Sequence, residues 1–436
     1  MLKTISGVAV NLASTFLFQF LLIKSTQFNS VADSYYLALA IFLFLGSVFT
    51  SMIQFTYQKK LFVNSVIQVP IYNRIITLSK RALILNSIFL FSVTLLTNQF
   101  TNGPIFTLRQ LLLMAVAGGF QILATVSVIF SYGLGNKFLP GFSGVYPSLG
   151  SSIVFFDASL DSILIGMCVG LAIQLAHNVF ASKAIWKSSA KAYQSSESAK
   201  SESEILMTIQ YTFLGAYVVI QRIIFGFSGS LSISEFATAE KITQSATSFL
   251  TGGFNQYAYN SDVSELETRD FHKGRQYSRQ DRYLIFLTLI LAFIIYFQRD
   301  LLALLFNLAE INSLAETRVA DYFKPLLILV STASIGGLIT SKLYSVGETR
   351  LCALTGISNA AIVASSLFLL FFTNKLNFIA IAYLICSTFN MTVKIFQWYA
   401  IYLPKVNKPF NRESLIEVFR IYSVLLFLVF LSVVAR

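Results

Sequence analysis

The sequence has few charged residues for its length. Charged side chains make up 12% of the 436 residues, whereas ordinary globular proteins hold roughly 25%. Hydrophobic residues supply 55% of the chain, and 42 residues are phenylalanine. A soluble surface needs more charge than this to stay dispersed. The composition therefore excludes a string of soluble domains and predicts a polytopic membrane protein.

Histidine and cysteine are also scarce. The two histidines, His177 and His272, are too few for a histidine-rich metal centre. The three cysteines stand far apart inside apolar runs without a CxxC pair, so we interpret them as small buried hydrophobes. The sequence contains no Walker loop, HExxH, GxSxG or metal-ligand cluster. We therefore expect no metal, no cofactor and no enzyme activity.

Thirteen stretches qualify as candidate membrane spans, because a span needs about 20 mostly apolar residues. The fifth is the weakest, since Pro140 and Pro147 interrupt it. The candidates are residues 5–23, 35–55, 82–96, 111–131, 138–156, 162–185, 205–227, 233–257, 283–297, 322–343, 352–373, 377–402 and 415–435. A polar, serine-rich linker, residues 186–204, separates the first six from the next six. The sequence thus predicts an all-α protein with six-helix lobes at 1–185 and 205–402. Residues 403–436 add a loop and a thirteenth helix.

Basic residues gather in alternate connections between these spans. The connections that we assign to the cytoplasm hold Lys59, Lys60, Arg74, Lys80, Arg81, Lys187, Lys191, Lys200, Arg269, Lys273, Arg275, Arg279, Arg282, Lys405, Lys408 and Arg412. The short opposite connections hold only Lys24 with Asp33, Arg109, Asp157 with Asp161, and Lys375. The longer stretch 298–321 carries charges of both signs. This positive-inside asymmetry predicts a cytoplasmic N-terminus and explains the net charge of +12 without nucleic acid.

The two halves share a pattern at a constant offset of 202 residues. A serine, an acid three residues later, and a glutamine–aromatic–x–tyrosine group recur in the second and eighth spans. The residues are Ser30, Asp33, Gln54, Phe55 and Tyr57, and then Ser232, Glu235, Gln256, Tyr257 and Tyr259. Six helices per half is an even number, so both halves would share one orientation. Such a parallel repeat, with a substrate path between the lobes, is typical of transporters.

Polar side chains inside spans are the best guide to function, because they are costly in hydrocarbon and usually face a bundle interior or water. The eighth span carries one polar face, formed by Glu240, Gln244, Thr247, Ser248, Thr251 and Asn255 and widened by Lys241. Its repeat mate, the second span, has a narrower stripe that ends at Gln54. A helix with such a face would insert poorly against lipid, so we expect it to line a wet cavity.

Arg222 is predicted near the outer end of the seventh span, about level with Glu235, Glu240 and Lys241. Two interpretations stay open. Arg222 and a glutamate could form a pair that merely neutralises both charges. Alternatively, a glutamate could pair with the cation in one state and take a proton in another. Asp33, at the outer end of the second span, is interpreted as an interfacial cap, with a role in coupling as the alternative.

A second polar cluster is predicted on the sixth and twelfth spans. Asn390 and Lys394 share a stripe with Gln397 on the twelfth span, and Gln174 and His177 lie at a comparable level of the sixth. Lys394 either snorkels to the inner headgroups or forms an anion site reachable from the cytoplasm. In the second interpretation, His177 is its titratable companion.

Two stretches resemble a known family. Residues 30–60 begin S-V-A-D-S-Y-Y-L-A and end Q-F-T-Y-Q-K-K, and they resemble the second span of bacterial polysaccharide flippases. Residues 235–259 begin E-F-A-T-A-E-K-I and are similar to the eighth span of these proteins. Size, lobes and basic inner loops match Wzx-type O-antigen flippases of the multidrug/oligosaccharidyl-lipid/polysaccharide (MOP) exporter superfamily. The resemblance covers about residues 1–402, and the thirteenth span departs from the commonest twelve.

The resemblance implies transfer of an undecaprenyl-diphosphate-linked oligosaccharide to the outer leaflet of the bacterial cytoplasmic membrane. It implies as partners this lipid, the bilayer, and the polymerase and chain-length proteins of the same pathway. Lys394 and His177 would capture the diphosphate from inside, Arg222 and Lys241 would hold it further out, and Glu235 or Glu240 would couple to protons. Two alternatives remain. A drug or cation antiporter of the same superfamily would favour acids over these bases, and a polysaccharide polymerase would need a large outer loop.

Overall fold

The computed structural model describes much of the chain and divides it into two compact units, Met1–Ser234 and Glu235–Arg436. The described residues are 2–63, 66–67, 69–100, 106–133, 144–188, 202–227, 232–247, 298–311, 315–322 and 349–373, with single residues and short groups between 326 and 427. Within these ranges the chain is almost wholly helical. The predicted all-α class is therefore confirmed.

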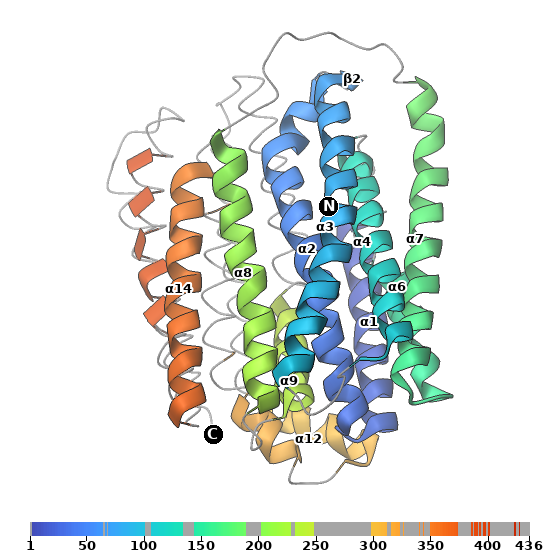
Figure 1. The fold of residues 1–436 in the computed structure, drawn as a ribbon, viewed down its shortest axis with the longest axis vertical. Coiled ribbons are helices and arrows are strands. Elements are labelled where there is room, and N and C mark those ends of the chain that lie inside the picture. The colour runs from blue at the N-terminus through green and yellow to red at the C-terminus, as the bar shows by residue number, and fades with distance from the viewer. Residues whose placement is uncertain are drawn as a thin grey trace. The chain divides into compact units, whose positions relative to one another are not determined.

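The first unit is built mainly of long helices (Figure 1). They are α1 (Leu2–Thr26), α2 (Ser30–Leu61), α3 (Val69–Phe100), α4 (Leu108–Gly133), α7 (Leu160–Ser188) and α8 (Glu202–Phe227). A shorter helix, α6 (Val145–Ser151), continues as the 3-10 turn η1 (Ser152–Phe155). Two short strands, β1 (Phe62–Val63) and β2 (Val66–Ile67), pair antiparallel between α2 and α3.

The described part of the second unit contains α12 (Gln298–Ala309), α14 (Thr349–Thr373) and most of α9 (Ile233–Thr247), which begins at the junction of the units. Residues 315–322 are also helical. The predicted span at 283–297, and most of those at 322–343, 377–402 and 415–435, lie outside the described residues. The lobe boundaries inferred from the repeat stay predictions.

Five described helices contain a stretch long and apolar enough to cross a membrane. The stretches are Ser30–Phe49, Ile71–Val93, Leu108–Phe130, Leu160–Phe180 and Thr208–Phe225. Each overlaps a span predicted from hydropathy alone. The fifth predicted span is the exception in length, because its described helix starts at Val145 and tightens into η1. Pro147 lies in the first turn of α6, where a missing N–H costs no helical hydrogen bond.

Helices α2 and α3 are longer than the spans predicted for them. Each has 32 residues, which is about 48 Å of helix, whereas the hydrocarbon core is about 30 Å thick. Both helices can therefore extend beyond the apolar layer. As a result, Lys59 and Lys60 lie in the last turns of α2, and Arg74, Lys80 and Arg81 lie in α3, where a loop was expected.

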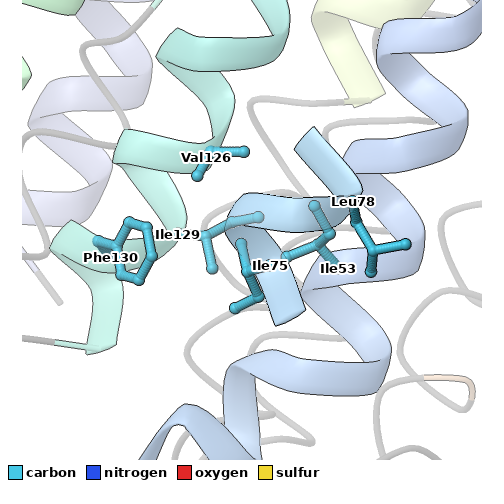
Figure 2. Close-up of a cluster of buried hydrophobic side chains, with 6 residues drawn as sticks. All are labelled: Ile53, Ile75, Leu78, Val126, Ile129 and Phe130. Atoms are coloured by element: carbon cyan, nitrogen blue, oxygen red, sulfur yellow. The ribbon is translucent and has the colours of Figure 1, made fainter. Parts of the chain in front are cut away.

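A cluster of aliphatic side chains holds α2, α3 and α4 together. Ile53 of α2 meets Ile75 and Leu78 of α3, and the α4 side chains Val126, Ile129 and Phe130 close the cluster (Figure 2). The spacings of three and four residues put each contribution on one helical face. Phe49, Ile71 and Tyr72 pack around the edge.

Helix α6 packs against α7 through glycine. A Cβ added at Gly150 would collide with the backbone oxygen of Gly166, and a Cβ at Gly170 would collide with that of Tyr146. The two backbones thus approach more closely than any side chain would allow. Small residues serve this purpose in membrane helices, where close van der Waals packing drives association.

Replacing Gly166 with alanine should destabilise the protein, because the new methyl group meets backbone rather than a movable side chain. We expect a loss of about 1–3 kcal/mol, the usual cost of overpacking. The measurement is the thermal unfolding midpoint of the purified protein in detergent. Gly46→Ala is the control, because its Cβ would meet only Gln121 and Ile122 side chains at 3.7 Å. Equal midpoints for both variants would contradict the close α6–α7 contact.

Candidate functional site

Two of the charged side chains that the structure describes are buried: Arg222 is 3% exposed and Glu235 is 4% exposed. Arg222 lies on α8, at the end of the apolar stretch Thr208–Phe225. The preceding side chain, Gln221, is also buried and donates a hydrogen bond from Nε2 to the Tyr217 hydroxyl at 3.0 Å. Helix α8 packs on α2, and the cationic and amide side chains at this end of α8 are buried within the protein.

Carboxylates are absent from the middle of the described first-unit helices. Every acid on these helices lies within the first four residues of its own helix: Asp33 in α2, Asp161 in α7, and Glu202 and Glu204 in α8. An acid at a helix N-terminus is stabilised by the helix dipole and the free N–H groups there. The described interior of the first unit therefore carries a buried cation but no buried anion.

Asp33 contacts the repeat-related motif of the second half. Its Oδ1 accepts a hydrogen bond from the backbone N–H of Ser234 at 2.7 Å and from the hydroxyl of Ser232 at 3.4 Å. Ser234 is the second residue of α9, whose first N–H groups have no partner within the helix. Asp33 thus supplies a cap from a distant part of the chain. The two copies of the repeated serine–acid motif, one with Asp33 and one with Ser232, are therefore in contact through these hydrogen bonds.

Glu235 forms an ion pair in the second unit. Its Oε1 lies 3.5 Å from Nη1 of Arg318, whose side chain is 47% exposed. One residue further along α9, the ring of Phe236 packs edge-on against Tyr322 with centroids 5.5 Å apart. The sequence showed Arg318 only as one charge of the mixed stretch 298–321. Arg318 and Tyr322 are four residues apart, so on a helix they share one face. That spacing could have predicted that both contact the same helix.

Polar residues predicted on the sixth span form hydrogen bonds with neighbouring helices of the first unit. His177 Nδ1 shares a hydrogen bond with the Tyr146 hydroxyl of α6, and the rings stand edge-on. Asn178 Nδ2 donates to Ser127 Oγ of α4 at 2.8 Å. Gln174 is buried one turn earlier. These contacts tie α7 to α6 and α4, and Tyr146 is a partner that sequence reasoning missed.

The other predicted site residues are placed only in part. Glu240 and Lys241 are half-buried on α9. Gln54 lies on α2 and Gln244 on α9, but their side chains are outside the described set. Asn255 and Lys394 also lie outside the described residues, whereas Asn390 is described in the second unit. Among the residues that the structure describes, no group of three histidine, cysteine or acidic side chains could hold a metal.

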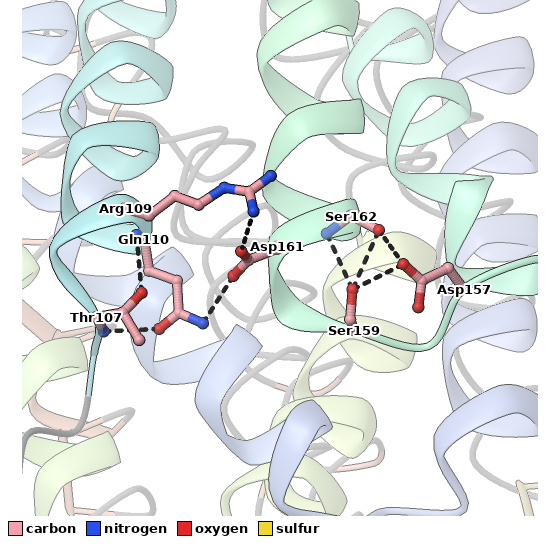
Figure 3. Close-up of polar contacts among 7 residues, drawn as sticks. All are labelled: Thr107, Arg109, Gln110, Asp157, Ser159, Asp161 and Ser162. Atoms are coloured by element: carbon pink, nitrogen blue, oxygen red, sulfur yellow. Dashed lines mark hydrogen bonds and ion pairs between the residues drawn. The ribbon is translucent and has the colours of Figure 1, made fainter.

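The starts of α4 and α7 are joined by polar side chains (Figure 3). Arg109 Nη1 lies 3.3 Å from Asp161 Oδ2, and Gln110 Nε2 donates to Asp161 Oδ1 at 2.8 Å. Gln110 and Thr107 also form a reciprocal capping box at the start of α4. The two connections, both assigned by sequence to the outer side, therefore lie at the same end of the unit.

Asp157 precedes α7 and is held by two serines. Its carboxylate accepts hydrogen bonds from the hydroxyls of Ser162 and Ser159, the latter at 2.9 Å (Figure 3). These bonds favour the ionised form, so the pKa of Asp157 lies below its ordinary value of 3.8. Ser159 Oγ also accepts the backbone N–H of Ser162 at 3.2 Å, within the first turn of α7.

Removing the Ser162 hydroxyl should raise the pKa of Asp157 toward its ordinary value, because this bond contributes most to the shift. A depressed folded-state pKa gives stability that is present at neutral pH and lost as the pH falls through that value. Carbon-detected NMR titration of the Asp157 carboxyl in Ser162→Ala measures the change. Ser159→Ala should give a smaller rise, and an unchanged pKa in Ser162→Ala would contradict the assignment.

Asp33→Ala should lower stability by about 1 kcal/mol, the typical cost of losing a helix N-cap. The variant leaves the N–H of Ser234 without its acceptor at the start of α9. Thermal unfolding in detergent measures the loss. Asp33→Asn keeps an acceptor oxygen and should lose less. If the asparagine variant were as unstable as the alanine variant, capping would not explain the contact.

Known structures share the fold of this chain, although no family model and no curated protein sequence matches it. An outward-facing multidrug resistance MATE family transporter of the MOP superfamily superimposes with a TM-score of 0.59 at 12% identity, over 96% of both chains. An inward-facing multidrug resistance MATE family transporter of the MOP superfamily gives a TM-score of 0.57 at 10% identity, over 95% of this chain and 99% of the other. A MOP superfamily transporter from Pyrococcus furiosus, described as having a binding pocket of reversed polarity, gives a TM-score of 0.58 at 11% identity. The match covers 94% of this chain and 96% of the other. The chain therefore has the fold of the MOP-superfamily transporters.

Proposed function

We propose that the protein is a membrane transporter, not an enzyme, and that it flips a lipid-linked oligosaccharide carrying a diphosphate. The observation that carries the proposal is the buried Arg222 on an apolar helix, in a unit whose described helix interiors hold no carboxylate. Ionisable side chains inside membrane spans are rare and often mark the path of a substrate. An anionic headgroup that passes along the helix would be attracted to this positive charge.

The physical task is to carry a charged, hydrated headgroup through hydrocarbon while the lipid tail stays there. Arg222 can meet phosphate oxygens with two parallel N–H groups, which is the geometry that makes arginine a strong phosphate ligand. Lys241, half-buried on α9, would be a second point of contact. Lys394 and His177 would receive the diphosphate on the cytoplasmic side.

Movement would follow from rocking of two lobes about a central site, the usual route of repeat-built transporters. Glu235 or Glu240 would couple this movement to protons by exchanging a cationic partner for a proton. The ion pair of Glu235 with Arg318 is a contact that such an exchange would break. With this substrate the protein would act in the bacterial cytoplasmic membrane, and its product would pass to the polymerase and chain-length proteins of the same pathway.

A drug or cation antiporter is the second candidate. The structural neighbours named as multidrug MATE transporters favour it, and Glu240, beyond the first turn of α9, would be its acid. The buried charge of the first unit argues against it, because a cation-binding cavity needs carboxylates where this chain has Arg222. A polymerase would need catalytic groups in a large outer loop, whereas the stretch 298–321 includes the apolar helix α12.

Replacing Arg222 with glutamine should reduce transport about tenfold or more, since hydrogen bonds to charged groups contribute about 1.5–3 kcal/mol. The measurement is the surface polysaccharide formed in a bacterial strain whose own flippase gene has been deleted. Arg222→Lys keeps the charge but loses the paired geometry, so it should retain an intermediate level.

Arg109→Gln is the matched control, because Arg109 is exposed and its pair with Asp161 lies at the surface. Exposed ion pairs contribute little, so this variant should transport at the wild-type level. Each variant is compared at equal protein level in the membrane. Wild-type polysaccharide from Arg222→Gln would overturn the role of Arg222, and resistance to cationic drugs without polysaccharide would favour the antiporter.

A further inference from the structure

A polar face joins α14 to the helical residues described between 385 and 397. Gln397 Nε2 donates to Thr355 Oγ1 of α14 at 3.2 Å, and both side chains are buried. Cys386 Sγ donates to the backbone oxygen of Asn359 at 3.4 Å. Asn390 is described between these two contacts in the sequence, four residues after Cys386, and its side-chain oxygen is buried.

Three amide oxygens on this face are buried and accept no hydrogen bond. They are Oδ1 of Asn359, Oδ1 of Asn390 and Oε1 of Gln397. Buried polar atoms nearly always have a partner, so three such acceptors from two adjacent helices point to a donor that arrives from elsewhere. The first unit also holds buried amide oxygens that accept no hydrogen bond, on Asn11 of α1, Asn86 of α3, and Gln210 and Gln221 of α8. On the α14 face, the Thr355–Gln397 and Asn359–Cys386 contacts join the helical residues that carry the acceptors.

The charge of the surrounding sequence decides which kind of donor fits. Residues 350–402 contain no aspartate or glutamate, whereas they contain Arg350, Lys375 and Lys394. A metal cation held by three neutral oxygens in this segment would bring a charge that nothing in it balances. Hydroxyl groups donate hydrogen bonds without adding charge. The face is therefore suited to a neutral ligand rich in hydroxyl groups.

We propose that Asn359, Asn390 and Gln397 accept hydrogen bonds from sugar hydroxyls of the transported lipid. The inference rests on the proposed function and adds to it a subsite that recognises the sugar rather than the diphosphate. Lys394, which the sequence predicts on the same stripe as Asn390 and Gln397, belongs to the phosphate side of the headgroup. The three oxygens are buried in this structure, so a ligand would reach them only after the helical residues that carry them move apart.

The test compares two lipids in proteoliposomes that contain the full-length protein. One is a polyprenyl diphosphate that carries a trisaccharide of neutral hexoses, and the other is the same diphosphate without sugar. Asn390→Leu and Gln397→Met each remove one acceptor. We expect each variant to slow transport of the glycosylated lipid about tenfold while transport of the bare lipid stays close to wild type.

Ser358→Ala is the matched control on α14, because the Ser358 hydroxyl bonds to Leu354 of its own helix. It should move both lipids as the wild type does. Asn390→Ser keeps an acceptor in a smaller side chain, so it should preserve the preference for the glycosylated lipid even if Asn390→Leu fails to fold. Equal transport of both lipids by the variants and the wild type, or an equal loss for both lipids, would overturn the sugar subsite alone. Failure of the wild type to move either lipid would instead overturn the proposed function.

Discussion

The structure depends first on the cost of placing charge in hydrocarbon. A helix satisfies its own backbone there, but an ionised side chain must find a partner, water or a ligand. In the described helices of the first unit, acids lie in the first turn, where helix dipoles and free N–H groups stabilise them. Arg222 departs from this pattern, since it is buried beside Gln221 at the end of an apolar stretch. The proposed function uses this buried cation as the attraction for an anionic headgroup.

Buried amides have two kinds of surroundings in this chain. In the first unit, Asn178 is bonded to α4 and His177 to α6, so these polar groups join neighbouring helices. In the second unit, the side-chain oxygens of Asn359, Asn390 and Gln397 accept no hydrogen bond. Such acceptors also occur in the first unit, so the contacts of α14 with Cys386 and Gln397 are what single out the proposed sugar face.

Hydropathy predicted the existence and approximate position of the described long helices, because a span of about 20 apolar residues has few alternatives in a membrane. It did not predict the extra length of α3, since a helix can continue into the interface on polar residues such as Arg74 and Lys80. The fifth span was weak in sequence, and in the described residues it consists of α6, with Pro147 in its first turn, followed by η1.

Side-chain partners were harder to predict than helices. The repeat pointed to Asp33 and Ser232 as equivalent positions, but only the structure shows that the two motifs touch. The pairing of Glu235 with Arg318 and of His177 with Tyr146 depends on helix rotation and crossing, which a single sequence does not encode in any short pattern. Burial of Arg222 was predicted from its place in a span. The structure buries this side chain, and its role in a cationic path stays a prediction.

The central claim is that the protein moves an anionic, sugar-bearing lipid and not a cation. The most direct measurement uses the purified wild-type protein in proteoliposomes and follows a fluorescent polyprenyl diphosphate oligosaccharide and the cationic dye ethidium side by side. The account predicts that the labelled lipid reaches the opposite leaflet faster than in protein-free vesicles, while ethidium flux stays at the background rate. Ethidium transport without lipid transfer would contradict it.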